Sequence, residues 1–351
     1  MYNLFFFANY NNMKKIIKNK YILLIPILIL NIISLIYLYN TKYFLKQFIF
    51  LTISYIALFL SSKINYKFIL KYLKYLYIFS IFLLLLVLII GREINGAKAW
   101  LQFFGFSIQP SEITKLILVI YFAYLIENNN NFLKLIILTL IPSFLTFLEP
   151  DTGAIIIYLI ILFSCLKYSK VNKKSFIIIT IIILLFLIAN VSLYFINKDL
   201  LINIYGTKIF YRIDRLITFK NQDNIQNIYS LISIGSNKLL YIPENHNDFI
   251  FASIISKYNF FIFIIIIICI FLIISYYIRY SNKNKNISNI TNFIILNMLI
   301  FQIFYNILMN LSLLPIIGIP FPFLSYGGSY LLTLYILIGF SINFNNMDMD
   351  K

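Results

Sequence analysis

A short polar segment, Pro243–Phe251, carries the most distinctive chemistry in this sequence, because the residues around it are almost all apolar. It holds the only histidine of the chain, His246, and an aspartate, Asp248, that comes directly before an apolar run. An ionisable side chain at the edge of a bilayer is costly, and by default it is a candidate functional residue. Asp248 could instead cap the helix that follows it. A single histidine without cysteines nearby argues against a zinc site.

Glu112 and Lys115 form a second charged group, at the start of another apolar run. Residues three apart share one face of a helix, so these two side chains can form an ion pair. Ser111 is a suitable N-cap, and Glu112 suits the first turn of a helix. The structural interpretation is therefore a cap and an intrahelical ion pair. The functional interpretation places Lys115 in a hydrated cavity, facing a phosphate.

Two further charged clusters lie between apolar runs. The sequence Glu149-Pro150-Asp151 could flank a sugar or bind a cation, and Asp151 could equally be the N-cap of the next helix. Arg212 and Arg215 lie within one turn of the longest polar segment. Arginine forks bind phosphate oxygens in a bidentate way, whereas the alternative is a solvated arginine–aspartate pair.

The segment Pro320–Ser329 contains two prolines and a Gly-Gly pair between apolar runs. This composition predicts a non-helical, re-entrant element at membrane depth. Such backbone is tolerated only where it is covered by protein or lines a water-filled cavity. The segment therefore predicts a polar cavity that opens outward.

Membrane helices must position all of these groups. Of the 351 residues, 61% are hydrophobic and only 12% are charged, so the solvent of this chain is lipid. The net charge of +17 does not indicate nucleic acid, because the lysines lie in short gaps between apolar runs. That pattern sets membrane topology and attracts anionic lipid headgroups. The two cysteines lie inside apolar runs, which is typical of packing residues.

A helix needs about 20 apolar residues to cross a bilayer. We expect an all-α integral membrane protein with ten spans, near Tyr21–Leu38, Leu45–Ser62, Leu70–Ile90, Ser111–Ile126, Phe132–Leu148, Gly153–Leu166, Phe176–Ile196, Phe249–Tyr277, Thr291–Leu314 and Tyr330–Phe344. Residues 21–344 would form one membrane domain between tails at 1–20 and 345–351. Residues 197–248 would be a large extracytoplasmic loop between spans seven and eight.

Lysine placement gives the orientation of these spans. If the spans alternate, the basic clusters near residues 14–20, 63–74, 167–174 and 279–285 all fall on one side. The positive-inside rule makes that side cytoplasmic, and both termini then lie in the cytoplasm. The polar segments described above fall on the opposite, extracytoplasmic side.

Taken together, five short motifs resemble the SEDS family, which comprises the shape, elongation, division and sporulation proteins. They occur in family order and are Gly96-Ala97 with Trp100, Gln109-Pro110-Ser111-Glu112 with Lys115, Glu149-Pro150-Asp151, Asn247-Asp248-Phe249-Ile250-Phe251, and Phe323-Leu324-Ser325-Tyr326-Gly327-Gly328-Ser329. The stretch Leu314–Pro320 resembles the rod-shape branch, with the division branch as the alternative. Where the family usually has two glutamates after the aspartate motif, this chain has Ser256-Lys257.

The resemblance implies a bacterial inner-membrane peptidoglycan glycosyltransferase that polymerises lipid II, releases undecaprenyl pyrophosphate and works with a class B penicillin-binding transpeptidase. It implies Asp248 as the catalytic general base. The substrate-binding residues that it implies are Glu112, Lys115, Asp151, Arg215, Trp100, Gln302, Asn306 and Ser325. We predict no cofactor and no metal ligand set, and the sequence leaves open whether a divalent cation takes part.

Two other functions fit a multi-pass protein with a polar cavity. One is a transporter that flips the lipid-linked precursor across the membrane. The other is a membrane scaffold that holds the transpeptidase without catalysing a reaction. Replacement of Asp248 distinguishes both from the polymerase.

Overall fold

The computed structural model describes residues 2–94, 97–103, 106–169, 192–217, 225–236, 242–282 and 284–350. Its helices are α1 (Tyr2–Leu38), α2 (Phe44–Ser61), α3 (Tyr66–Ile90), α4 (Pro110–Glu127), α5 (Phe132–Leu148), α6 (Thr152–Ser164), α8 (Lys198–Ile217), α9 (Ile225–Ser236), α10 (Ile250–Arg279), α11 (Ile287–Asn310) and α12 (Gly328–Asp350). A short 3₁₀ turn, Cys165–Tyr168, follows α6.

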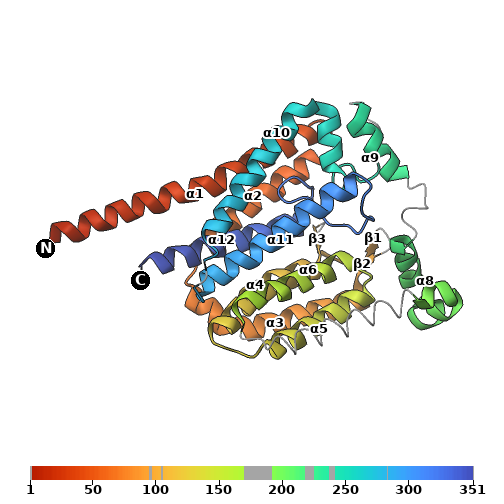
Figure 1. The fold of residues 1–351 in the computed structure, drawn as a ribbon, viewed down its shortest axis with the longest axis horizontal. Coiled ribbons are helices and arrows are strands. Elements are labelled where there is room, and N and C mark those ends of the chain that lie inside the picture. Colours follow the sequence, from red (N-terminus) through yellow and green to blue (C-terminus); the bar gives the residue numbers. More distant parts are fainter. Residues whose placement is uncertain are drawn as a thin grey trace.

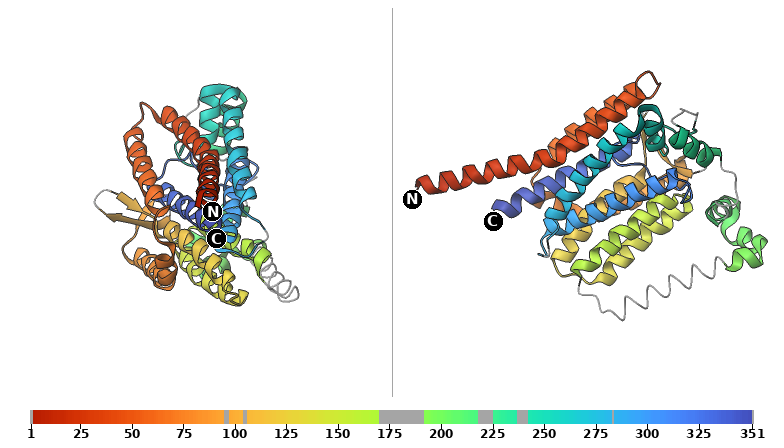
Figure 2. Two further views of the ribbon diagram at one scale, coloured as in Figure 1. Left: turned by 90° about the vertical axis from the view of Figure 1, so that its left-hand side faces the viewer. Right: turned by 45° about the horizontal axis from the view of Figure 1, so that its top comes forward.

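The long helices form one bundle, with both termini at the same end (Figure 1). The strands, α8 and α9 lie at the opposite end, which we call the outer end (Figures 1 and 2). In the described part of the chain, six helices are long and apolar enough to cross a membrane, and α5 and α6 are shorter apolar helices. The predicted helical membrane architecture is therefore confirmed. The count of ten stays a prediction, since most of the span expected near Phe176–Ile196 lies outside the described residues.

The fold is not purely helical, because the segment between α3 and α4 contains a small antiparallel sheet. Its strands are β1 (Arg92–Ile94), β2 (Ala97–Phe103) and β3 (Phe106–Ile108), in the order β1-β2-β3. Strand β2 alternates: Ala99 and Leu101 are buried, while Trp100 between them and the flanking Lys98 and Gln102 are more exposed. This period of two is the pattern of a strand with one covered face.

Three predicted segments contain helix in the structure. In the predicted tail 1–20, α1 is helical from Tyr2, and the cytoplasmic placement of the tail stays a prediction. The tail 345–351 is likewise helical as far as Asp350. The extracytoplasmic segment 197–248 contains the helices α8 and α9.

Helix α12 lies at the centre of the bundle. In its membrane-spanning window 83% of the residues are buried, compared with 28% in α2 and in α3. Helix α12 packs closely on α2 at Gly339, where an added Cβ would come within 2.6 Å of the carbonyl oxygen of Leu58 and would also meet Ser61 Oγ. Small residues allow this close approach, which is how helices associate in lipid without a hydrophobic driving force between them.

Candidate active site

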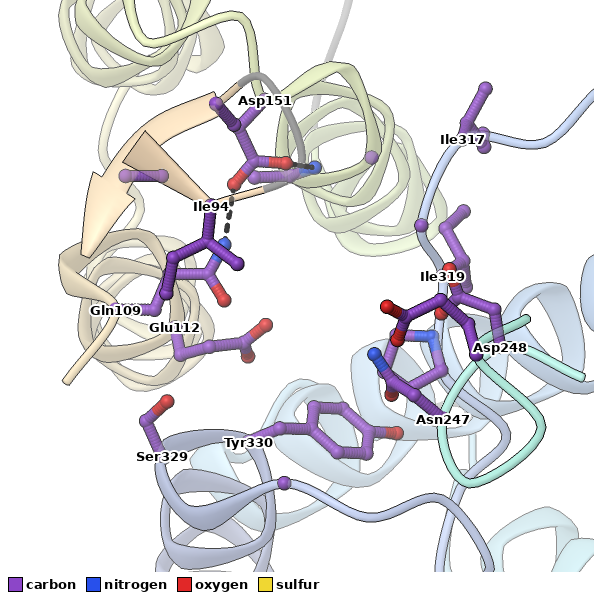
Figure 3. Close-up of a pocket in the computed structure, with 18 of the residues that line it drawn as sticks. Ile94, Gln109, Glu112, Asp151, Asn247, Asp248, Ile317, Ile319, Ser329 and Tyr330 are labelled. Carbon is purple, nitrogen blue, oxygen red and sulfur yellow. Dashed lines mark hydrogen bonds between the residues drawn. The ribbon is translucent and has the colours of Figure 1, made fainter. Parts of the chain in front are cut away.

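A pocket of about 980 Å³ lies at the outer end of the bundle, where α4, α6 and α12 begin. The segments 243–249 and 316–320 and the sheet complete its walls. In Figure 3, Glu112 and Asp248 point toward each other from facing sides of the pocket, with Asp151 on a third side. The tertiary structure thus brings together residues from all five of the motifs.

Asp248 lies just before α10, in the segment of turns 242–249. Asp248 does not cap the helix. The N-cap residue of α10 is Phe249, whose side chain makes no capping hydrogen bond. Within the described part of the chain, no donor binds the carboxylate of Asp248, which faces the pocket. Burial, together with the negative charge of Glu244, raises the pKa of Asp248 to about 7. A carboxylate with this pKa suits a general base near neutral pH.

Three consecutive carbonyl groups hold the backbone at Asp248. The oxygen of His246 accepts the amide hydrogen of Tyr326 at 2.9 Å, and the oxygen of Asn247 accepts the hydroxyl of Ser325 at 2.8 Å. The oxygen of Asp248 accepts two side-chain amides from α11, Asn306 at 3.0 Å and Asn310 at 3.1 Å. The backbone that carries the carboxylate is therefore fixed on both sides.

Asn306 and Ser325 are not among the described residues that line the pocket, and their predicted role in binding substrate stays a prediction. Both are fully buried. Asn306 also donates to the oxygen of Ile319 at 2.8 Å, and Ser325 accepts the amide of Phe321 at 2.7 Å. Their polar atoms are engaged in holding the walls of the pocket together.

Glu112 and Lys115 form the predicted ion pair, at 2.7 Å between carboxylate and ammonium. Both are nearly buried, and both line the pocket. The predicted cap is different, because Gln109 is the N-cap of α4 and Pro110 occupies its first turn. Ser111 instead donates its hydroxyl to Asp151. The structural and functional interpretations of this pair are therefore compatible.

Asp151 is the N-cap of α6, as one interpretation of the sequence predicted. One carboxylate oxygen accepts the amide of Ala154 at 3.0 Å, and the other accepts Gln109 Nε2 at 2.8 Å and Ser111 Oγ at 2.9 Å. These bonds tie the start of α6 to the start of α4. The adjacent Glu149 is fully buried, and among the described residues neither of its carboxyl oxygens has a hydrogen-bond partner. Burial raises the pKa of Glu149 to about 9, which keeps it neutral at pH 7.

Trp100 and Gln302 line the pocket, as predicted for residues that contact substrate. Trp100 stands on β2, and Gln302 accepts the hydroxyl of Tyr330 at 3.3 Å. The backbone of Arg215 lies in α8, and its side chain is outside the described part of the structure.

Sequence reasoning missed Asn310 and the role of Glu244. Asn310 also accepts the amide of Ala252 at 3.1 Å, so it caps α10 from a neighbouring helix. Its position, four residues after Asn306 on one face of α11, was the available signal. Glu244 has a φ of 59°, which turns the chain sharply ahead of Asp248.

The described side chains give the pocket an excess of negative charge. Its carboxylates are Glu112, Asp151, Glu244 and Asp248, and its ammonium group is Lys115. Lys115 already pairs with Glu112. An anionic ligand would therefore need a further positive charge from elsewhere.

The sequence matches the FtsW/RodA/SpoVE family, described as cell cycle protein, over residues 14–348. This chain belongs to the SEDS family. A SEDS relative from Wigglesworthia glossinidia brevipalpis, named probable peptidoglycan glycosyltransferase FtsW, is 31% identical over 95% of each chain. The peptidoglycan glycosyltransferase MrdB of Helicobacter pylori is 26% identical, over 91% of this chain and 87% of that one. Because the relatives carry two different names, FtsW and MrdB, the assignment to the rod-shape branch stays a prediction.

Two solved SEDS-like structures share the fold. One, from a study of how a peptidoglycan synthase complex coordinates polymerization and crosslinking, superposes with a TM-score of 0.78 at 22% identity, over 93% of this chain and 97% of that one. The rod shape determining protein RodA of Thermus thermophilus gives a TM-score of 0.69 at 21% identity, over 93% and 96%. The protein is a multi-pass protein of the bacterial inner membrane.

Proposed function

We propose that this protein is a peptidoglycan glycosyltransferase that polymerises lipid II at the outer face of the inner membrane. Relatives that align along nearly the whole chain carry the name peptidoglycan glycosyltransferase. The observation that carries the assignment of the site is Asp248, a carboxylate that faces the pocket and has no hydrogen-bond donor among the residues that the structure describes. A base with a free lone pair can take the proton of a substrate hydroxyl.

The reaction balances with a single base. The hydroxyl oxygen of the acceptor sugar forms a bond to the anomeric carbon of the donor, and its proton passes to Asp248. The bond between that carbon and the pyrophosphate breaks, and its electron pair leaves with undecaprenyl pyrophosphate. This is a displacement with inversion, which needs no covalent intermediate on the enzyme. The leaving group is already a good one, so a second catalytic carboxyl group is not required.

Stabilisation of the pyrophosphate is the second task of the site. Lys115 lies in the pocket but is paired with Glu112 at 2.7 Å, so its charge is partly neutralised. We assign the remaining positive charge to Arg215, whose fork matches phosphate oxygens. A divalent cation that arrives with the pyrophosphate would add to it.

The packing of the helix bundle supports a transporter less well than it supports a polymerase. The pocket is lined from the outer ends of α4, α6 and α12. Further along the same helices, side chains such as Leu118, Phe122, Ile161 and Ile338 are completely buried. In the described part of the bundle the pocket therefore ends against packed side chains, as a polymerase that works at one face requires.

A solved relative also supports a crosslinking partner for this protein. One solved relative comes from a peptidoglycan synthase complex that coordinates polymerization with crosslinking. We propose that the partner of this chain is a class B penicillin-binding protein with transpeptidase activity. Its presence would distinguish a synthase complex from an isolated polymerase.

The decisive experiment compares Asp248→Asn with the wild type. The purified full-length protein, co-expressed with the class B penicillin-binding protein of the same genome, is given labelled lipid II, and glycan chains are separated by gel. We expect polymerisation to fall by at least about a hundredfold, because the proton acceptor is lost. Asp199→Asn is the matched control, since Asp199 is exposed on α8 outside the pocket. Normal glycan chains from Asp248→Asn would refute the assignment.

A further inference from the structure

The imidazole ring of His246 is enclosed by two tyrosines from distant parts of the chain. It stacks on Tyr43 with ring centroids 3.9 Å apart and an angle of 10° between the planes. Tyr326 meets it edge-on at 5.6 Å, and the two tyrosine rings are themselves 5.1 Å apart. Tyr43 is the N-cap residue of α2, and Tyr326 belongs to the re-entrant segment. A three-ring cluster therefore joins three elements two residues before Asp248.

The outer ends of α1 and α2, residues 34–47, form what we call the outer hairpin. Besides the ring stack, the outer hairpin makes two hydrogen bonds to the backbone of the re-entrant segment. Ser34 Oγ donates to the oxygen of Leu324 at 2.6 Å, and Gln47 Nε2 donates to the oxygen of Ser325 at 3.4 Å. Ser34 and Gln47 are fully buried, so these donors would be costly to leave unpaired. The outer hairpin is thus fixed to one wall of the pocket.

The same hairpin is also bound to the helix that follows Asp248. Lys257 Nζ donates to the oxygen of Tyr37 at 3.4 Å, and Tyr258 donates to the oxygen of Ile36 at 3.1 Å. Both acceptors lie in the last turn of α1, where a positive charge is favourable. Lys257 stands where the family resemblance leads us to expect a glutamate. In this chain, then, α10 is tied to α1 by a cation at a helix end.

The surroundings of His246 fit a packing role better than a chemical one. The nearest carboxylate, Glu244, is 3.7 Å from Nε2, which is too long for a hydrogen bond. The charged groups that act on the ring are Glu244 and Lys42, with opposite effects. Burial is the larger effect and lowers the pKa of His246, so the ring is neutral at pH 7. A neutral aromatic ring stacks on tyrosine without the cost of burying a charge.

We propose that His246 is a positioning residue, whose ring locks the Asp248 segment to the outer hairpin through its stack on Tyr43. The proposal rests on the polymerase function, because the stack of His246 on Tyr43 would control the position of the catalytic Asp248. A shift of about 1 Å in a catalytic group can cost a hundredfold in rate. The outer hairpin thereby becomes part of the machinery that places the base.

Two substitutions of His246 separate stacking from proton transfer. His246→Ala removes the ring, and His246→Phe keeps a flat aromatic ring that cannot titrate. We expect His246→Ala to lower kcat for lipid II polymerisation by roughly tenfold or more with little change in KM. We expect His246→Phe to recover most of that loss. If both variants lose activity equally, the ring nitrogens are needed and the proposal is overturned; it is equally overturned if both retain wild-type activity.

Tyr43 tests the other half of the stack. In a double-mutant cycle, Tyr43→Ala combined with His246→Ala should lose little more kcat than either alone, since both break one contact. Additive losses would overturn the proposal. The control is Tyr66→Ala, which removes an edge-on contact with Phe344 at the inner end and should leave kcat unchanged. Asp248→Asn in the same assay tests the function itself, so the failure of the function and the failure of the lock give different results.

Discussion

At the scale of the residue, the site is a carboxylate whose proton affinity is set by its surroundings. Asp248 has no hydrogen-bond donor on its carboxylate among the described residues, while its backbone oxygen has two. The side chain is thus left free for chemistry, and the main chain is held. Gly318, with a φ of 70°, is close to this carboxylate: a Cβ there would lie 4.0 Å from Asp248 Oδ2. Any residue with a Cβ would be strained at this positive φ.

The rate of polymerisation should therefore depend on pH in a specific way. Asp248 acts as a base only when ionised, and its pKa is raised to about 7, so the rate should rise as pH increases through about 7. Glu244→Gln removes the negative charge that contributes to this shift, so the rising limb should move to lower pH. A pH–rate profile of both proteins with lipid II checks this. An unchanged limb in Glu244→Gln would show that another group controls the profile.

At the scale of the element, the end of α11 organises the start of α10. Asn310 donates to the oxygen of Asp248, accepts the amide of Ala252, and through its own carbonyl accepts the hydroxyl of Ser230 from α9. One residue thus joins three helices next to the base. A helix start that is capped from outside cannot keep its position if the cap is removed.

Asn310→Ala should therefore affect catalysis as well as stability. We expect kcat to fall by roughly tenfold, because the backbone of Asp248 loses one of its anchors. Asn343→Ala is the matched control: Asn343 is also buried and donates to the oxygens of Ser61 and Ile64, but at the inner end. Both variants should lower the melting temperature, and only Asn310→Ala should lower kcat. Equal kcat values in the two variants would contradict the role of Asn310.

At the scale of the whole molecule, the polar pocket lies at one end of a bundle whose outside is apolar. The pocket, the sheet, α8 and α9 lie at the outer end, and both termini lie at the other (Figures 1 and 2). Large apolar side chains such as Leu45, Phe68, Ile89 and Phe271 are exposed on the outside of the helices. In lipid these side chains are in their preferred solvent.

Reporter fusions test the topology, including the predicted span near Phe176–Ile196. A phosphatase that is active only outside the cytoplasm should be active when fused after Arg92 or Leu193, and inactive after Lys63 or Tyr168. The change between Tyr168 and Leu193 reports the seventh span directly, because an odd number of crossings must separate the two points. Equal activity at both points would remove that span from the topology.

The sequence by itself determined the class of the molecule and its strongest chemical group. Apolar runs of membrane length and clustered lysines are local properties, so they predicted the helices, the orientation and the non-helical element before α12. Asp151 as a cap and Glu112 with Lys115 as a pair were also readable, because both depend on spacings of three residues.

Only the tertiary structure decided what surrounds Asp248. Ser325 and Asn306 bear the same polar groups whether they face a ligand or a carbonyl, and packing assigned both to the carbonyls of the Asp248 segment and its neighbours. His246 had no partner in sequence, because Tyr43 lies two hundred residues away and meets it only when α1 and α2 fold against the re-entrant segment. Spacing along a chain determines contacts within one helix. Contacts between elements depend on how those elements pack, and that is where the environment of the base is set.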